Sequence, residues 1–136
     1  MAEAKKYNAP VTNPETAPFF EGAAAGKLMI RRCTACKKAH HYPRGLCPFC
    51  FGDRLDWKRA SGRGTVTTFT VVHQPWFPAF KAEIPYNIAQ VELAEGPRLV
   101  ANVVPATDLH VGLPVEVVFD DVAPDLTLPR FKPVSS

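Results

Sequence analysis

The sequence has no run of about eighteen consecutive apolar residues, the length that a membrane-spanning helix needs. Residues 1–18 are polar and contain proline, and they lack the apolar segment of a secretory signal. We therefore expect a protein that neither spans a membrane nor is secreted.

The chain also has few residues suited to catalysis. It contains no glycine-rich loop of the kind that binds phosphate, because Gly62-Arg63-Gly64 has the pattern of a turn into a strand. The cysteines form a metal-binding pattern, and once a metal takes their thiols no serine or cysteine stands in a pattern typical of a nucleophile. We do not expect this chain to act as an independent enzyme.

The four cysteines are the strongest signal in the chain. Cys33 and Cys36 form one Cys-x-x-Cys pair, Cys47 and Cys50 form another, and ten residues separate the pairs. Each two-residue gap lets a tight turn direct both sulfurs at one ion, which is typical of tetrahedral Zn²⁺ sites. Four sulfurs fill the coordination sphere of zinc, so we expect a structural metal and not a catalytic one. Thiolate ligands need reduced cysteines, which indicates the cytoplasm.

Two other interpretations of the cysteines stay open. The thiols could be free core residues or disulfides, although two matched pairs with no cysteine left over favour a metal site. Iron is the alternative to zinc, because rubredoxin-type sites also use four thiolates in paired turns. His40 and His41 lie between the pairs and are not needed as ligands, so we expect them on the hairpin.

Composition indicates a small globular protein rich in β-strands. Apolar residues make up 46% of the chain and charged residues 21%, close to the average of folded domains. The 136 residues suit one compact domain, or a small zinc module joined to a modest second module. Fourteen prolines favour turns and edge positions over long helices.

Positive charge is concentrated in one part of the chain. The formal net charge is only +3, but ten of the sixteen lysines and arginines lie between Lys27 and Arg63, where Asp53 and Asp56 are the only acids. Four thiolates with Zn²⁺ carry about −2, so this segment stays basic after metal binding. Such a surface suits nucleic acid, a phosphate-bearing cofactor or an acidic protein face.

Residues 1–27 are predicted to form an arm followed by a short helix. Asn13-Pro14 and Thr16-Ala17-Pro18 are both typical of a helix start. The helix should run to about Ala25 and end at Gly26, and its apolar face should pack on another part of the protein.

Residues 28–60 are predicted to form a zinc ribbon. A strand over residues 28–32 would enter the first cysteine turn, and a return strand over residues 40–44 would lead to the second. Residues 55–58 would then leave the ribbon, with Trp57 packed between the two modules.

Residues 61–136 are predicted to form a small β-barrel with a C-terminal tail. Apolar and polar residues alternate over residues 87–93, so Ala89, Val91 and Leu93 should point inward. Three further segments have the composition of strands, and turn sequences separate them: residues 65–73, 99–104 and 115–119. Four or five short strands suit an oligonucleotide/oligosaccharide-binding (OB) fold, with an SH3-like barrel as the second choice.

The order and spacing of short motifs from about residue 14 to residue 133 resemble those of one family. The motifs are, in order, PFF and GKL around the helix, CTAC, YPRGLCPFC, GRGTV, TFTVVH, PY, VEL, EGPRL, VGLPV, VF and LPRF. Together they resemble the DUF35 proteins, which join a rubredoxin-like zinc ribbon to an OB-fold. The resemblance implies a mainly β fold with an N-terminal helix, a rubredoxin-like zinc ribbon and then a small OB-fold barrel.

The same resemblance implies an accessory role in acyl-CoA metabolism. Members of the family stabilise or activate a partner enzyme, which is a thiolase, a thiolase-like aldolase or acyltransferase, or a MaoC-type enoyl-CoA hydratase. They bring no catalytic residues of their own and help to hold or pass acyl-CoA. We therefore expect a hetero-oligomer with such an enzyme.

Two positions depart from the family pattern. Glycine often follows the second cysteine of each pair, because that position tolerates positive φ. Here Lys37 and Phe51 occupy these two positions, and Gly52 comes one residue later. The departure concerns the geometry of the turns and not the ability to bind metal.

Candidate contact residues follow from the basic segment and from one aromatic loop. A cationic surface would steer the phosphates of CoA or meet the partner enzyme; its candidates are Arg32, Lys37, Lys38, Arg44 and Arg63. The proline-flanked loop of residues 75–80 offers Trp76, Phe77 and Phe80 as interface anchors. The alternative is that this loop folds back and plugs the end of its own barrel.

A nucleic-acid-binding module is the second functional hypothesis. Zinc ribbons and OB barrels both serve that role, and Phe69 or Tyr86 would stack on bases if they were exposed. The barrel half of the chain is acidic on balance, however, whereas a nucleic-acid groove is basic. We therefore favour the accessory subunit.

Overall fold

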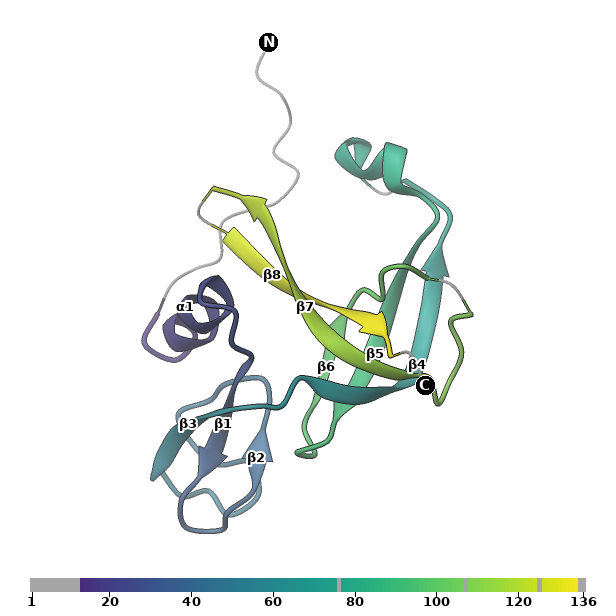
Figure 1. The fold of residues 1–136 in the computed structure, drawn as a ribbon. Helices are drawn as coiled ribbons and strands as arrows, with labels where there is room; N and C mark the ends of the chain where they lie inside the picture. Colours follow the sequence, from purple (N-terminus) through teal and green to yellow (C-terminus); the bar gives the residue numbers. More distant parts are fainter. Residues whose placement is uncertain (1–12, 76, 107, 125, 135–136) are drawn as a thin grey trace.

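The computed structural model describes residues 13–75, 77–106, 108–124 and 126–134. It contains two β-sheets with one short α-helix beside them (Figure 1). The smaller sheet has three strands and carries the cysteines, and the larger has five strands and curls into a barrel. The fold is mainly β, as the composition predicts.

The smaller sheet is built around β1 (Met29–Cys33), which pairs antiparallel with β2 (Ala39–His40) on one side and β3 (Leu55–Arg59) on the other. The return strand expected over residues 40–44 begins one residue earlier and ends at His40. Residues 41 and 42 form a bend, and Pro43, which follows them, has no N–H to donate to a sheet. Residues 55–58 were expected to lead out of the ribbon, and the structure instead pairs β3 along the whole of β1 as the third strand of its sheet.

The larger sheet has the strand order β6-β5-β4-β7-β8. Its strands are β4 (Arg63–Val72), β5 (Tyr86–Leu93), β6 (Arg98–Ala101), β7 (Pro114–Ala123) and β8 (Leu126–Pro133). All neighbouring strands in it are antiparallel. A short 3₁₀ helix, η1 (Pro78–Glu83), links β4 to β5 and projects from the barrel at the top of Figure 1.

A parallel bridge between Val103 and Phe131 brings the segment after β6 to β8 and nearly closes the barrel. Phe131 donates its N–H to the carbonyl oxygen of Asn102 (2.9 Å) and accepts from the N–H of Val104 (2.7 Å). Five strands closed in this way form an OB-fold, so the fold expectation is confirmed. No strand was predicted after residue 119, so strand β8 was not expected.

The core runs without interruption from the base of the ribbon into the barrel. Ala89, Val91 and Leu93 are buried on β5, so the inward phase predicted for this strand is confirmed. Leu28 and Ile30, which enter the ribbon, belong to the same buried cluster. The ribbon therefore shares its apolar packing with the barrel.

The helix α1 (Ala17–Ala24) lies beside both sheets and contacts β8 and β1 (Figure 1). It begins after Thr16 and ends before Gly26, whose φ of 76° turns the chain toward β1. Asn13 supports the start, because its side-chain oxygen accepts the N–H groups of Glu15 (2.9 Å) and Thr16 (3.0 Å). Among the residues that the structure describes, none of the helices has the length and apolar character needed to cross a lipid bilayer.

Candidate metal centre

The four cysteine sulfurs converge at the end of the ribbon. All four lie within 4.8 Å of one another, and the Cys33–Cys50 and Cys36–Cys47 sulfur pairs are each 3.6 Å apart. Sulfurs at the corners of a tetrahedron with metal–sulfur bonds of 2.3 Å would be about 3.8 Å apart. The cysteines are therefore positioned to bind a single metal ion.

Each cysteine pair sits in a tight turn closed by the backbone. Lys37 donates its N–H to the carbonyl oxygen of Cys33, and Phe51 donates to that of Cys47, both at 2.9 Å. Both donors have positive φ, 68° for Lys37 and 61° for Phe51. The turns thus keep the left-handed geometry of a glycine position although neither residue is glycine.

The surroundings of the thiols favour partial ionisation. Burial opposes ionisation of Cys47, but the backbone N–H groups of Cys50 and Phe49 and the neighbouring thiols lower the pKa of its thiol to about 7. The N–H of Cys36 likewise lowers the pKa of Cys33. For Cys50 the N–H of Gly52 acts in the same direction, yet the other thiols raise its pKa to about 11. Full deprotonation therefore needs a cation among the sulfurs.

The two histidines between the cysteine pairs are separate from the sulfur cluster. His40 ends β2 and is buried, and neither of its ring nitrogens has a hydrogen-bond partner among the described residues. His41 packs between the rings of Phe19 and Tyr42, with centroids 5.2 Å and 4.1 Å away. His40 therefore lies in strand β2, whereas His41 lies just after it.

The five basic residues proposed as contacts differ in location and in their partners. Arg32 is held within the ribbon, since its guanidinium donates to both carboxylate oxygens of Asp56 at 2.8 and 3.3 Å. Arg63 opens β4 on the barrel, in register with Glu116 on β7. The other three are exposed on or next to the cysteine turns: Lys37, Lys38 and Arg44.

The three aromatic residues of the loop of residues 75–80 differ in what the structure shows of them. Trp76 lies outside the described residues. Phe77 is 66% exposed, whereas Phe80 turns back to within 6.0 Å of the ring of Tyr86. Phe77, Phe80 and Tyr86 all line a hollow of about 870 Å³ at the barrel end, with Phe77 the more exposed of the two loop rings. One ring of the loop faces solvent and another packs on its own barrel.

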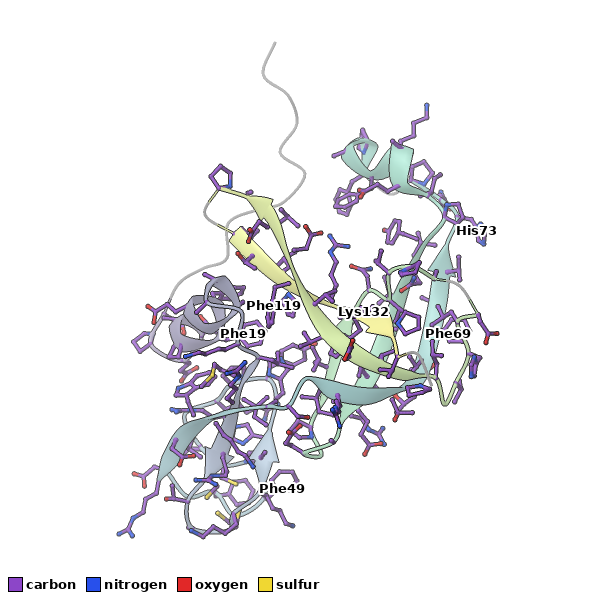
Figure 2. The ribbon with its side chains drawn as sticks, in the orientation of Figure 1. Phe19, Phe49, Phe69, His73, Phe119 and Lys132 are labelled. Atoms are coloured by element: carbon purple, nitrogen blue, oxygen red, sulfur yellow. The ribbon has the colours of Figure 1, made fainter. Side chains whose placement is uncertain are left out.

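Three apolar residues exposed on the ribbon were not singled out from the sequence as contact residues: Leu46, Phe49 and Phe51. Their exposure could have been expected from their positions next to the metal-binding cysteines. A turn that wraps an ion near the surface has no core in which to bury large side chains. Figure 2 shows Phe49 at the outer end of the ribbon, beside the sulfur atoms.

A second feature that was not predicted from the sequence is an apolar cleft where the helix, ribbon and barrel meet. It has a volume of about 350 Å³, and Phe19, Tyr42 and Leu99 are among its lining residues. Tyr42 also ties the ribbon to the barrel, because its hydroxyl accepts the N–H of Val100 at 3.1 Å.

Two family models match successive parts of the chain. The model of the ChsH2 rubredoxin-like zinc ribbon domain matches residues 20–56, and that of the ChsH2 C-terminal OB-fold domain matches residues 57–120. Both matches agree with the sheets described above.

Curated relatives are similar over most of the chain. A probable enoyl-CoA hydratase alpha subunit of Thermomonospora curvata is 44% identical over 91% of this chain. A DUF35 domain-containing scaffold protein of Methanocaldococcus jannaschii is 35% identical over 69% of this chain and 68% of its own length. The chain spans about two fifths of the hydratase subunit, 39% of its length.

Solved structures show the same architecture. A chain of the structure titled "Ltp2-ChsH2(DUF35) aldolase" superposes with a TM-score of 0.82 at 41% identity, covering 92% of this chain and 98% of that one. A DUF35 protein of Sulfolobus solfataricus superposes with a TM-score of 0.68 at 19% identity, covering 90% and 87% of the two chains, and supports the fold alone.

Proposed function

The chain belongs to the DUF35 family, with the zinc ribbon and OB-fold of its ChsH2 members, and on that premise we propose that it is a non-catalytic accessory subunit of an acyl-CoA enzyme. The partner is a thiolase-like enzyme, whether thiolase, aldolase or acyltransferase, or a MaoC-like hydratase. Relatives named as a hydratase alpha subunit, a scaffold protein and an aldolase support both the enzyme class and the helper role.

The observation that carries this proposal is the saturated donor set. Four sulfurs satisfy a tetrahedral ion completely, so water and substrate have no coordination position at the metal. A metal held in this way stabilises the ribbon and activates no nucleophile. The chemistry then belongs to the partner.

Zinc is the ion that we propose for the site. It prefers four thiolates in tetrahedral geometry, and it does not cycle between oxidation states. Because such ligands must stay reduced, we also propose that the protein works in the cytoplasm.

We further propose that the basic side of the ribbon helps to hold acyl-CoA near the partner. Lys37, Lys38 and Arg44 are exposed on one segment, and their charges attract phosphate over distances close to the Debye length. This contribution is electrostatic, so it weakens as salt is added.

Co-expression tests the proposal. The chain should co-purify in fixed stoichiometry with the thiolase-like or MaoC-like protein encoded beside its gene, and the melting temperature of that enzyme should rise in the complex. An enzyme of this kind that elutes separately from the chain and has the same melting temperature with and without it would contradict the accessory role.

A further inference from the structure

The second cysteine turn holds a large apolar side chain in a backbone conformation that favours glycine. Phe51 has φ of 61° and is 77% exposed. A bulky L-residue is strained in the left-handed region, and a ring this exposed gains little from burial. Glycine would close the same turn without the steric cost. Folding alone therefore gives no reason for phenylalanine at this position. The residue instead indicates a contact with another molecule.

Two neighbours extend the apolar surface around Phe51. Leu46 is 54% exposed and Phe49 is 53% exposed, and together the three residues form what we call the ribbon tip. Leu46 and Phe51 line one hollow of about 490 Å³, and Phe49 lines a second of about 310 Å³. Arg44 and Pro48 belong to both hollows, so the surface is continuous. Contiguous exposed apolar groups of this kind mark interaction sites.

The rim of the ribbon tip is positively charged. Arg44 lines both hollows, the Lys38 ammonium lies 5.0 Å from the centre of the Phe49 ring, and Lys37 is exposed in the first cysteine turn. Glu15 contributes one acid to the edge of the larger hollow. A binding partner that complements this surface has an apolar depression surrounded by carboxylates.

We infer that the ribbon tip is the surface with which this chain docks onto its acyl-CoA enzyme, with Phe51 as the anchor in an apolar, acid-rimmed depression of that enzyme. The inference rests on the proposed function and adds the surface and the chemistry of the partner's face. It places the interface at the outer end of the ribbon, away from the aromatic loop of η1 (Figures 1 and 2).

The geometry of Phe51 allows a test in which stability and binding change in opposite directions. Phe51→Gly relieves the strained turn, so the melting temperature should stay the same or rise by about 1–3 °C. The same change removes the anchor, so the dissociation constant for the purified neighbouring thiolase-like or MaoC-like protein should rise about 30-fold or more. A structural role alone would not separate these two effects.

Two control variants locate the effect. Lys37→Gly relieves the same strain in the first cysteine turn and removes one charge of the basic ribbon, so it should weaken binding less than about fivefold. Phe77→Ala truncates the exposed ring of the aromatic loop, directly before η1, and should leave the dissociation constant unchanged. Binding by the wild type should weaken as salt is raised from 50 to 500 mM, on the order of tenfold, because the rim is charged.

The outcomes separate the docking surface from the proposed function. If Phe51→Gly binds the enzyme within threefold of wild type, or if Phe77→Ala abolishes binding, the ribbon tip is not the interface although the accessory role stands. If Phe51→Gly abolishes only self-association in sedimentation experiments, the tip joins two copies of this chain and the inference is wrong. A wild-type chain that binds no such enzyme would contradict both the accessory role and the docking surface.

Discussion

The sulfur of Cys36 lies 3.6 Å from the sulfur of Cys47, which joins the two cysteine turns across eleven positions of the chain. Two ionised sulfurs at this separation repel each other, so the contact is stable only with a cation between the turns or with protons on the thiols. The centre therefore links folding of the ribbon to metal binding.

Replacing a ligand should disrupt the ribbon. Cys47→Ser should lower the metal content from about one equivalent to a small fraction of that, since three sulfurs bind far more weakly than four. It should also lower the melting temperature, because Ile30 and Leu28 pack at the ribbon base within the common core. Metal analysis and thermal unfolding check this, with Lys37→Ala as a control in the same region that leaves all sulfurs in place. A metal-free variant that melts like the wild type would show that the ion does not stabilise the fold.

One buried amide holds the segment after β6 against β5. The side chain of Asn87 donates to the carbonyl oxygen of Val103 (2.8 Å) and accepts its N–H (2.7 Å), and both residues are buried. Asn87→Ala would leave both backbone groups without their partner, which should cost about 2–4 kcal/mol of unfolding free energy. Glu92→Ala, on the exposed face of the same strand, is the matched control and should cost under about 1 kcal/mol. Equal losses for the two variants in urea titrations would contradict the role of Asn87.

His41 should make stability fall in acid. Burial, with a smaller effect of His40, lowers the pKa of His41 from 6.5 to about 4. The unfolded chain therefore takes up a proton below pH 6.5 that the folded chain accepts only near pH 4. Stability is at its full value above pH 6.5, declines as the pH falls from 6.5 to 4, and is constant with respect to this group below that range.

A variant isolates that effect. His41→Phe preserves an aromatic ring against Phe19 and Tyr42 but cannot be protonated. Between pH 7.5 and pH 4.5 it should lose about 2 kcal/mol less unfolding free energy than the wild type. Loss of metal in acid affects both proteins and cancels in the comparison. The exposed His73→Phe is the control, and a slope unchanged by His41→Phe would refute the assignment.

The pair of Arg32 and Asp56 should matter for the ribbon and not for ligands. Each lowers the free energy of the other's charged form, so the side-chain hydrogen bond raises the pKa of Arg32 and lowers that of Asp56. Because both side chains are more than a third exposed, Asp56→Asn should reduce stability only slightly, and high salt should remove the difference. Arg32→Gln should leave the affinity for the partner enzyme unchanged, which a binding titration checks. A large loss of affinity would return Arg32 to the list of contacts.

The parts of the fold that local patterns determine could be predicted from the sequence. The spacing of Cys33 to Cys50 indicated the ribbon, and the alternation through Ala89, Val91 and Leu93 identified the inward face of β5. The helix end at Gly26 followed from the preference of glycine for positive φ. In each case a few adjacent residues carry the whole signal.

The parts that depend on distant contacts could not be predicted in this way. Strand β8 was missed because Pro129 and Pro133 argue against a strand, yet it lies at the edge of the order β6-β5-β4-β7-β8. Its pairing with the segment after β6 is fixed by tertiary contacts. Asn87 occupies an inward position of the alternating pattern, and a polar residue in that phase was the available sign that the barrel needs a hydrogen-bonding side chain there.

The exposed residues of the ribbon also could not be identified from the sequence alone. Phe51 was noted for the turn geometry that it should disturb, but its exposure could be known only once the turn was seen to keep positive φ. Arg32 was grouped with the exposed bases although Asp56, in register with it on β3, holds it. Charge composition predicts a basic module and does not predict which bases are paired.

A titration of enzyme activity distinguishes an accessory subunit from an independent enzyme. The initial rate of acyl-CoA turnover would be measured for the purified chain alone, for its thiolase-like or MaoC-like partner alone, and for the partner with increasing amounts of the chain. An accessory subunit should give no turnover alone, and the rate of the partner should rise until the two are present in a fixed ratio. Turnover by the isolated chain, or a partner that reaches its full rate and stability without it, would contradict the accessory role.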